Sequence, residues 1–312
     1  MTGILNPDNR LFTLARQGGR PPSALVAIVV VFVVLALALF PGQILGRMML
    51  LSYDGAPRFP SAIQPVVEPI VQNVTMFLLI FMGLWVWLRL CSKRPFWTLG
   101  WKRTNAVRLG FRGAVTGAVM VGATVELSMV AGASVTPGLW QTMGPAALGF
   151  RLLSLLSYFV QGPAEETLFR GWLLPVIGAR YRPSIGVLVS SIIFSVAHAQ
   201  SHGITLLGFL NLFLFGVFAA FYALADGGLW GVGAWHAVWN WTEDLLGFIS
   251  DGTPRLGLWS SVRAEGPDII TGGAFGPEGG LGCTIILLTA IGIIAMRTRR
   301  SCDGEGRSTE TG

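Results

Sequence analysis

The most evident deficit of this sequence is charge. Asp, Glu, Lys and Arg make up 12% of its 312 residues, about half the share that a soluble globular domain carries. Cysteine is scarce as well: Cys91, Cys283 and Cys302 are odd in number and show no metal-ligand spacing, so we expect no structural disulfide and no metal site built from cysteine. These deficits argue against an ordinary soluble enzyme and exclude a disulfide-rich secreted module.

Hydrophobic residues take the place of the missing charge. They amount to 52% of the chain, the mean hydropathy is +0.62, and several apolar runs reach the roughly 20 residues that a bilayer-crossing helix needs. We therefore predict an all-α, polytopic membrane protein with about eight transmembrane helices. The expected spans lie near residues 24–48, 68–91, 107–132, 146–178, 184–200, 203–225, 228–249 and 281–297.

Two of these spans have unusual features. The apolar stretch 23–40 follows several arginines, as in a signal sequence, but it is longer than the roughly 7–15 residues of a signal h-region, so we interpret it as a membrane anchor. The span 146–178 is too long for one straight crossing and contains Gly162 followed by Pro163. We expect a kink or a break of the helix at that dipeptide.

The distribution of Lys and Arg predicts the orientation in the membrane. Cytoplasmic loops of membrane proteins retain an excess of these residues, and with eight spans both termini lie on one side. Of the 22 Lys and Arg residues, 16 lie in segments on the side of the termini, 5 lie in segments on the other side, and Arg170 lies within a span. We therefore predict that both termini are cytoplasmic, and we attribute the net charge of +6 to this retention rather than to nucleic-acid binding.

We expect a single structural domain. Residues 1–22 are predicted to form a cytoplasmic N-terminal segment, residues 23–300 a single helical membrane domain with its motif core at 150–245, and residues 301–312 a disordered polar tail. The glycine-rich segment 250–280 is expected to be a loop of variable structure on the side opposite the termini. The expected localisation is that of a multi-pass integral membrane protein, in the plasma membrane if the source is bacterial.

The few ionisable residues at membrane depth are concentrated in three of the spans. Such residues are energetically expensive in a bilayer and indicate a functional site. Glu166 and Arg170 are four residues apart, so they can form an ion pair on one helical face and leave Glu165 turned toward a neighbouring helix. Two later pairs share this spacing of four residues: Phe194 with His198, and His236 with Asn240.

Counting residues from the predicted cytoplasmic ends gives the depth of these groups. At about 1.5 Å per residue, Glu165 and His198 each lie roughly 20 Å into the membrane and His236 about 12 Å. We therefore expect a carboxylate, two imidazoles and the amide of Asn240 to line one cavity that opens toward the cytoplasm. His202, at the end of its span, is a candidate for an additional ligand.

This set of residues suits the hydrolysis of an amide. A carboxylate and a histidine can remove a proton from a water molecule, while a histidine and an asparagine on one face can donate hydrogen bonds to a developing oxyanion. The same residue types also suit Zn²⁺, so the residues alone leave metal-dependent and metal-free chemistry open. The sequence has no His-Glu-x-x-His motif, and none of its serines or cysteines lies in a recognisable nucleophile elbow.

Three short patterns together resemble the motifs of a known family. They lie in order on separate hydrophobic spans: Glu165-Glu166-x-x-x-Arg170, Phe194-x-x-x-His198 and His236-x-x-x-Asn240. These patterns are similar to the motifs of the CPBP intramembrane proteases, a group that includes type II CAAX prenyl endopeptidases, bacteriocin-processing proteins and Abi-like self-immunity proteins. The matched stretch covers residues 150–245, and the other spans are similar only in being hydrophobic.

The resemblance implies an all-helical fold of eight spans with an active site reached from the cytoplasmic side. It implies that Glu165 and His198 activate the attacking water, and that His236 and Asn240 stabilise the oxyanion. The supporting positions around them would be Glu166, Arg170 and Phe194.

The resemblance leaves the role of a metal open. The family is commonly described as metalloproteases, in which case Glu165, His198 and His236 would hold one divalent ion such as zinc. A metal-free glutamate mechanism is compatible with the same residues. We favour it slightly, because only one anionic ligand is available to offset the charge of a dication.

The function predicted from the sequence is therefore that of an intramembrane endopeptidase. Its substrate would be a prenylated or otherwise membrane-associated protein, or a small secreted peptide; for a bacterial source, peptide processing is favoured. Its partners would be membrane lipid and this substrate, without nucleic acid. The alternative is a non-catalytic transporter or an immunity-type binding scaffold. Transporters often contain paired broken helices in inverted repeats, and the sequence has one broken span, which favours the enzyme.

Overall fold

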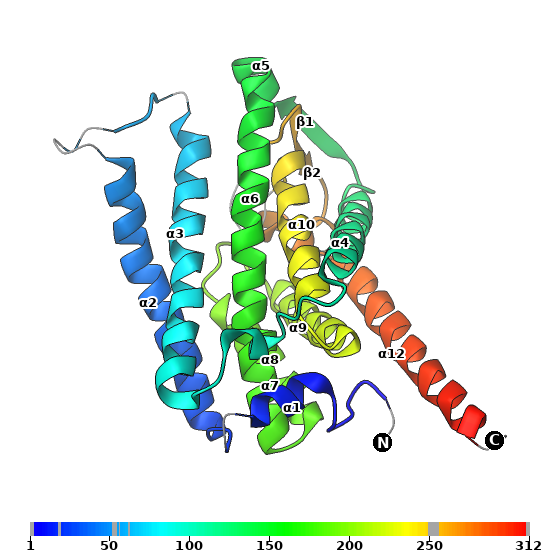
Figure 1. The fold of residues 1–312 in the computed structure, drawn as a ribbon. Coiled ribbons are helices and arrows are strands. Elements are labelled where there is room, and N and C mark those ends of the chain that lie inside the picture. Colours follow the sequence, from blue (N-terminus) through cyan, green and yellow to red (C-terminus); the bar gives the residue numbers. More distant parts are fainter. Residues whose placement is uncertain are drawn as a thin grey trace.

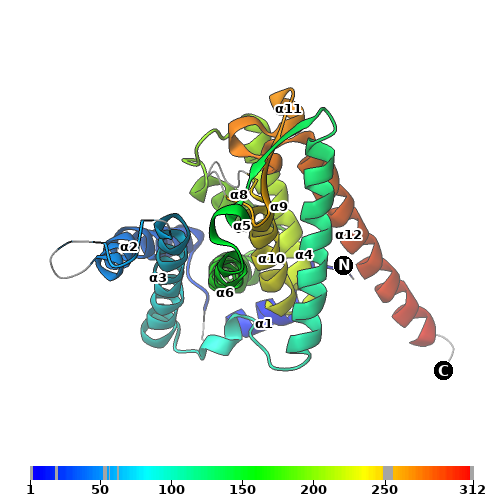
Figure 2. The same cartoon turned by 90° about the horizontal axis from the view of Figure 1, so that it is seen from above.

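The protein is a bundle of helices, seen from the side in Figure 1 and from one end in Figure 2. The computed structural model describes residues 3–17, 20–51, 55, 57–61, 63–248 and 256–309, with side chains for all of these except residue 65 and residues 299–309. The long helices are α2 (Ala24–Leu50), α3 (Gln64–Trp87), α4 (Ala106–Ser128), α6 (Ala146–Glu166), α8 (Pro183–Ala197), α9 (Leu206–Asp226), α10 (Trp230–Leu246) and α12 (Leu281–Thr309).

Each predicted span overlaps one of these long helices, which confirms a helical membrane protein. Among the described residues, four segments are both long and apolar enough to cross a membrane: Ala24–Leu50, Val66–Ser92, Leu206–Asp226 and Leu281–Thr298. The other long helices are shorter or carry more polar residues and glycines, because they face one another inside the bundle. The number of eight crossings and the side of the termini remain predictions.

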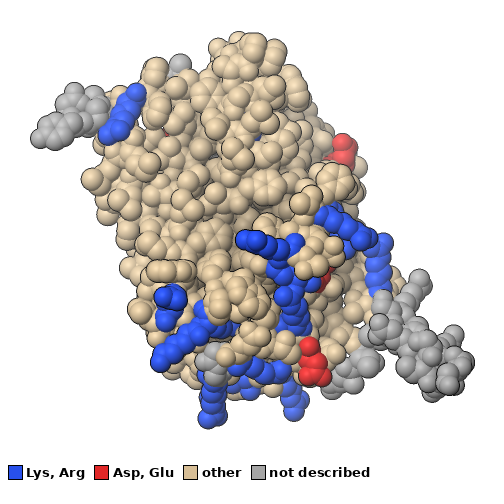
Figure 3. Space-filling view, in the orientation of Figure 1, with Lys and Arg blue, Asp and Glu red and all other residues tan. Residues whose placement is uncertain are grey.

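Apolar side chains cover the outside of the bundle. Leu25 and Phe40 on α2 are 73% and 70% exposed, and Phe111 on α4 is 73% exposed. Such a surface is unfavourable in water and matches the hydrocarbon region of a bilayer. In Figure 3 most Lys and Arg side chains of the visible face gather at its lower end, where Figure 1 shows both chain ends. We call this the basic end.

A short helix that the sequence analysis did not predict closes the basic end. Helix α1 (Arg10–Arg16) buries Leu11 and Phe12, and the ring of Phe12 lies against Gly178 of helix α7 (Leu174–Arg180). Arg94 donates a hydrogen bond to the carbonyl of Leu14 over 2.9 Å. Burial lowers the pKa of Arg94 to about 10, so this guanidinium stays charged at neutral pH and holds α1 in place.

The opposite end carries a two-stranded sheet. Strand β1 (Ala133–Pro137) pairs antiparallel with strand β2 (Ser260–Ala264), with Val135 opposite Val262. We call this the strand end. The remaining short elements are η1 (Leu88–Ser92), η2 (Phe96–Leu99), α5 (Leu139–Met143), α11 (Asp268–Thr271), η4 (Gly273–Phe275) and η5 (Pro277–Gly279). The described part of the segment 250–280 is thus a folded cap rather than a loop of variable structure.

The fourth predicted span is interrupted, but not where the sequence suggested. Helix α6 passes through Gly162 and Pro163 and ends at Glu166, and a π-helix, η3 (Thr167–Leu173), joins it to α7. The hydroxyl of Thr167 donates to the Pro163 carbonyl over 2.5 Å. Gly162 serves a helix contact instead of a break, because a Cβ there would lie 2.7 Å from the backbone nitrogen of Ala237.

Helix α10 lies at the centre of the bundle between α4 and α6 (Figure 2). On α4, Gly113 and Gly117 are one turn apart and face the carbonyl oxygens of Gly231 and Trp235, which a Cβ would approach to 2.0 and 2.5 Å. Small residues at this spacing let two helices pack with their backbones in contact. The two glycines therefore fix the position of α10, the helix that carries His236 and Asn240.

The last helix extends beyond its apolar part. α12 reaches Thr309 and so enters the polar stretch that begins at residue 301. The side chains of residues 301–309 and the whole of residues 310–312 lie outside the described residues. The predicted division of the chain into an N-terminal segment, a membrane domain and a tail remains a prediction.

Candidate active site

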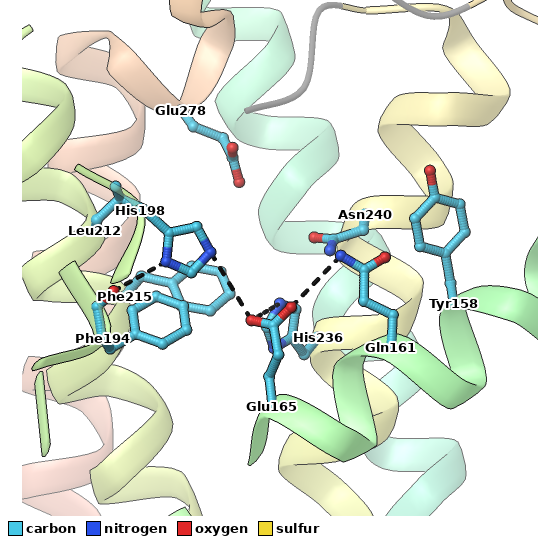
Figure 4. Close-up of a pocket in the computed structure, with 10 residues that line it drawn as sticks. All are labelled: Tyr158, Gln161, Glu165, Phe194, His198, Leu212, Phe215, His236, Asn240 and Glu278. Carbon is cyan, nitrogen blue, oxygen red and sulfur yellow. Dashed lines mark hydrogen bonds and ion pairs between the residues drawn. The ribbon is translucent and has the colours of Figure 1, made fainter. Parts of the chain in front are cut away.

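A polar cavity lies where α6, α8, α9, α10 and η5 meet. Figure 4 shows the residues that line it: Tyr158, Gln161, Glu165, Phe194, His198, Leu212, Phe215, His236, Asn240 and Glu278. Its volume is about 60 Å³, which exceeds the roughly 10–15 Å³ that one water molecule requires. The predicted catalytic residues Glu165, His198, His236 and Asn240 thus line one space, although they come from three separate spans.

The carboxylate of Glu165 is the central group of this cavity. Its side chain is buried near the end of α6, and Oε1 accepts a hydrogen bond from Gln161 Nε2 at 3.5 Å. Its second oxygen, Oε2, lies 3.9 Å from Nε2 of His198 and 4.0 Å from Nε2 of His236. No direct hydrogen bond reaches Oε2 from the residues that the structure describes. One carboxylate oxygen therefore faces both imidazoles at distances that one water molecule can bridge.

The end of α8 sets the orientation of His198. This residue is the C-cap of the helix, and its Nδ1 donates a hydrogen bond to the carbonyl of Phe194 over 2.9 Å. Because Nδ1 carries that proton, Nε2 of the neutral ring has its lone pair directed at Glu165. His198 remains 21% exposed, more than the other ionisable residues at the centre of the site.

A buried chain of charges orients His236. Its Nδ1 lies 2.8 Å from Oε1 of Glu166, and the same oxygen lies 3.0 Å from Nη1 of Arg170. All three side chains are 4% exposed or less. The sequence predicted the pair of Glu166 with Arg170; the structure adds His236 as a second donor to the same carboxylate. A histidine held in this way keeps a fixed ring orientation.

Phe194 packs between His198 and the buried Arg170. Its ring lies 4.4 Å from the guanidinium carbon of Arg170 and 4.6 Å from the centre of the His198 ring. The ring is also stacked on Phe215 at 5.6 Å. A cation over an aromatic face is stabilised electrostatically, so Phe194 supports both the buried Arg170 and the half-buried His198. This placement fits the supporting role that the family resemblance implies.

Several residues of the cavity were not predicted from the sequence. Gln161 and Tyr158 lie one and two turns before Glu165 on the same face of α6, and this spacing was a signal that could have identified them. Gln161 also accepts a hydrogen bond from Asn73 Nδ2 of α3 at 3.2 Å, which ties α3 to the site. Glu278 comes from η5, far away in the sequence, and no periodicity points to it.

Three other ionisable residues, His202, Glu68 and Glu126, lie outside the cavity. His202 is exposed beyond the end of α8, so the suggestion of an additional ligand is not supported by its position. Glu68 and Glu126 are exposed on α3 and α4, and Glu68 accepts a hydrogen bond from Gln72 at 3.1 Å. None of the three lines the cavity of Glu165 in the described part of the chain.

The less buried residues of the cavity lie on one side of Glu165. Gln161 on α6 and Asn240 on α10 are half-buried and lie on the side of Glu165 that faces the strand end. Glu278 lines the cavity on the same side. Toward the basic end, Glu166 and Arg170 are fully buried. The half-buried side of the cavity is thus the side away from the basic end, and the predicted opening toward the cytoplasm remains a prediction.

The spacing of the possible metal ligands was compared with that of a zinc site. Two ligands of a tetrahedral zinc ion lie about 3.4 Å apart, given bonds of about 2.0–2.1 Å. The distances of 3.9 and 4.0 Å from Glu165 Oε2 to the two imidazoles are longer. Among the described residues, no group of three or more His, Cys, Asp or Glu side chains is arranged to hold a metal ion. The residues in this arrangement do not fit a metal centre.

Two comparisons with known proteins cover the part of the chain that forms this site. Forty per cent of 81 residues are identical to an Escherichia coli protein described as "Uncharacterized 24.3 kDa protein", a match that spans 25% of this chain and 36% of that relative. Residues 147–242 match the model of the family described as type II CAAX prenyl endopeptidase Rce1-like. Residues 147–242 are therefore similar to the Rce1-like type II CAAX prenyl endopeptidases, and the resemblance drawn from the three motifs is confirmed for this part of an integral membrane protein.

Proposed function

We propose that the protein is an intramembrane endopeptidase that hydrolyses a peptide bond of a membrane-associated protein or peptide. The observation that carries this proposal is the position of Glu165 Oε2, which lies 3.9 Å from His198 Nε2 and 4.0 Å from His236 Nε2 in a polar cavity. The match of residues 147–242 to the model of the Rce1-like family supports a protease. Apolar helices around the site support a substrate that is itself tethered to the membrane.

Glu165 and His198 would activate the attacking water. A water molecule that bridges Glu165 Oε2 and His198 Nε2 donates to both atoms and directs a lone pair into the cavity. As it attacks the carbonyl carbon of the scissile bond, its proton passes to Glu165. The carboxylic acid then returns this proton to the leaving amine, so that one water is consumed and one amide bond is broken.

His236 and Asn240 would stabilise the negative charge on the carbonyl oxygen. Both side chains lie on one face of α10 and line the cavity. The ring of His236 directs Nδ1 at Glu166 and Nε2 at the cavity that Glu165 lines. His236 then donates to Glu166 from Nδ1 and to the oxyanion from Nε2, beside the amide of Asn240.

The substrate class follows from the surroundings of the cavity. An extended peptide presents its backbone amide to a narrow polar space, whereas a tethered end can stay in the lipid around α2 and α3. A prenylated CAAX-type protein and a bacteriocin-type secreted peptide both meet this description. For a bacterial source, the plasma membrane would be the site of action. The distances from Glu165 Oε2 to the two imidazoles are longer than those between the ligands of one zinc ion, so the proposed mechanism uses no metal.

Purified protein in proteoliposomes with a library of membrane-tethered peptides tests the proposed function. We expect the wild type to produce defined fragments in mass spectrometry, and Glu165→Ala and His198→Ala to abolish them while the protein stays folded. Glu126→Ala, which removes an exposed carboxylate of α4, is the matched control and should cleave like the wild type. Wild-type turnover in both site variants would contradict the assignment.

A further inference from the structure

Glu278 is an acidic residue in the cavity that the reaction described above does not use. It lies in η5, on the segment that precedes α12, and Figure 4 shows its carboxylate extending into the space across from Glu165. His198 and Asn240 flank that space on its two sides. A substrate that reaches the water at Glu165 therefore passes next to Glu278.

Two hydrogen-bonding groups fix the position of Glu278. The indole Nε1 of Trp239, a fully buried residue one position before Asn240, donates to Glu278 Oε1 over 2.9 Å. The amide of Asn211 on α9 donates to the backbone carbonyls of Glu278 and Gly280 over 2.7 and 3.0 Å, and accepts from Thr284 over 2.7 Å. Both the side chain and the backbone are thus held before any ligand arrives, as a binding group requires.

Even with His236 donating from both ring nitrogens, the lining carries more carboxylates than cations. Glu165 and Glu278 both contribute carboxylates, and among the described residues that line the cavity none is Lys or Arg. The guanidinium nearest in sequence to Glu165, that of Arg170, is buried in its pair with Glu166. In a site of low dielectric, a fixed carboxylate attracts a cationic group strongly and repels an anionic one.

We propose that Glu278 is a specificity-determining residue that binds a Lys or Arg side chain of the substrate beside the scissile bond. The inference rests on the proposed peptidase function. A Lys ammonium or an Arg guanidinium can donate to the oxygen of Glu278 that does not accept from Trp239. The same carboxylate disfavours an acidic residue, and also a free C-terminal carboxylate, at that position. With Glu278 in this role, the endopeptidase selects substrates with a basic residue beside the scissile bond.

A second role for Glu278, the positioning of His198, makes a different prediction. A residue that acts through His198 would change the rate for every peptide by the same factor, because His198 serves the reaction and not the substrate side chain. A residue that binds the substrate changes the ratio of rates between two peptides. The ratio is therefore the diagnostic quantity.

The experiment uses two tethered peptides that the wild type cleaves and that differ only at a residue flanking the scissile bond, which is Lys in one and Glu in the other. The ratio of kcat/KM values is measured for wild type, Glu278→Gln and Glu278→Lys. A charged hydrogen bond corresponds to about a tenfold to hundredfold preference. We expect the wild type to prefer the Lys peptide by about this factor, Glu278→Gln to lose most of the preference, and Glu278→Lys to reverse it.

The matched control is Glu265→Gln, an exposed carboxylate on the same segment outside the cavity, which should keep the wild-type ratio. Equilibrium binding of fluorescent, membrane-tethered versions of both peptides to Glu165→Gln protein gives a second readout that needs no turnover. A ratio that is unchanged in all Glu278 variants, in hydrolysis and in binding, overturns the inference but leaves the proposed function intact. A wild type that cleaves no peptide contradicts the proposed function, and the binding ratio then decides the inference.

Discussion

His236 donates from Nδ1 to Glu166 Oε1 over 2.8 Å, and this bond decides which nitrogen of the histidine faces the cavity. The same oxygen of Glu166 accepts from Arg170 at 3.0 Å. Because Glu166 is fully buried, its charge has to be compensated inside the protein. The orientation of His236 in the cavity therefore depends on the buried ion pair of Glu166 with Arg170, neither of which lines the cavity.

Removal of Arg170 should destabilise the protein strongly. Arg170→Leu leaves the carboxylate of Glu166 buried without its guanidinium, which costs about 3–5 kcal/mol of unfolding free energy in comparable buried pairs. Chemical unfolding in detergent, followed by circular dichroism, measures the loss. Arg108→Leu, which removes an exposed arginine of α4, is the control and should change the unfolding free energy little. Equal unfolding midpoints for the two variants would show that the buried pair does not stabilise the fold.

A methyl group at Gly162 should disturb the site without touching a polar residue. In Gly162→Ala the new Cβ would lie 2.7 Å from the backbone nitrogen of Ala237, so α6 and α10 have to move apart. We expect a loss of about 1–3 kcal/mol in unfolding free energy, and lower kcat, because Glu165 and His236 lie on these two helices.

Gly149→Ala is the matched control on the same helix, since a Cβ at Gly149 meets no atom within 4 Å. Alanine in a helix interior is favoured over glycine by about 0.5–1 kcal/mol, so this variant should be at least as stable as the wild type. If Gly162→Ala behaves in the same way, the close contact of α6 with α10 is not needed for activity.

The three motifs were sufficient to predict which helices carry the four proposed catalytic residues. Residues four apart share one face of a helix, so Glu166 with Arg170, and His236 with Asn240, could be placed from their numbers alone. The apolar runs located the helices in the same way. Helices α4 and α10 are less apolar than their position in a membrane suggests, because Gly113 and its neighbours pack against the backbone of α10.

What the sequence did not predict depends on contacts between distant segments. Glu278 reaches the cavity only because Asn211 and Trp239 hold η5 against α9 and α10. The pairing of β1 with β2 joins residues that are about 125 positions apart, as in the bond from Thr136 to Ser261. Helix α1 packs at the basic end through the contact of Phe12 with Gly178, which joins residues far apart in the sequence. No local pattern carries this information.

Removal of metal ions should leave the activity unchanged. The distances of 3.9 and 4.0 Å around Glu165 Oε2 exceed those between ligands of one zinc ion. We expect protein dialysed against a strong chelator to keep its kcat, and metal analysis of the active protein to give less than one equivalent of zinc. Loss of activity on chelation that added Zn²⁺ restores would mean that the two imidazoles and the carboxylate close around a metal.

The cavity should be accessible from the side opposite the basic end. If the basic end is cytoplasmic, as the distribution of Lys and Arg predicts, peptides that cannot cross the membrane reach Glu165 only from the other side. Sealed vesicles of both orientations, assigned with a tag after residue 312, measure cleavage of an impermeant peptide on each side. Cleavage only on the side of the tag would contradict the closure of the basic end by α1.

The coupling of Glu165 to His198 in catalysis is the most direct test of the account. A double-mutant cycle compares kcat/KM of wild type, Glu165→Gln, His198→Gln and the double variant, with His202→Gln as a histidine control outside the cavity. Groups that activate one water as a unit are not additive. We predict that each single variant loses activity about a thousandfold and that the double variant loses little more. Losses that multiply, or wild-type turnover in either single variant, would contradict a water held between these two side chains.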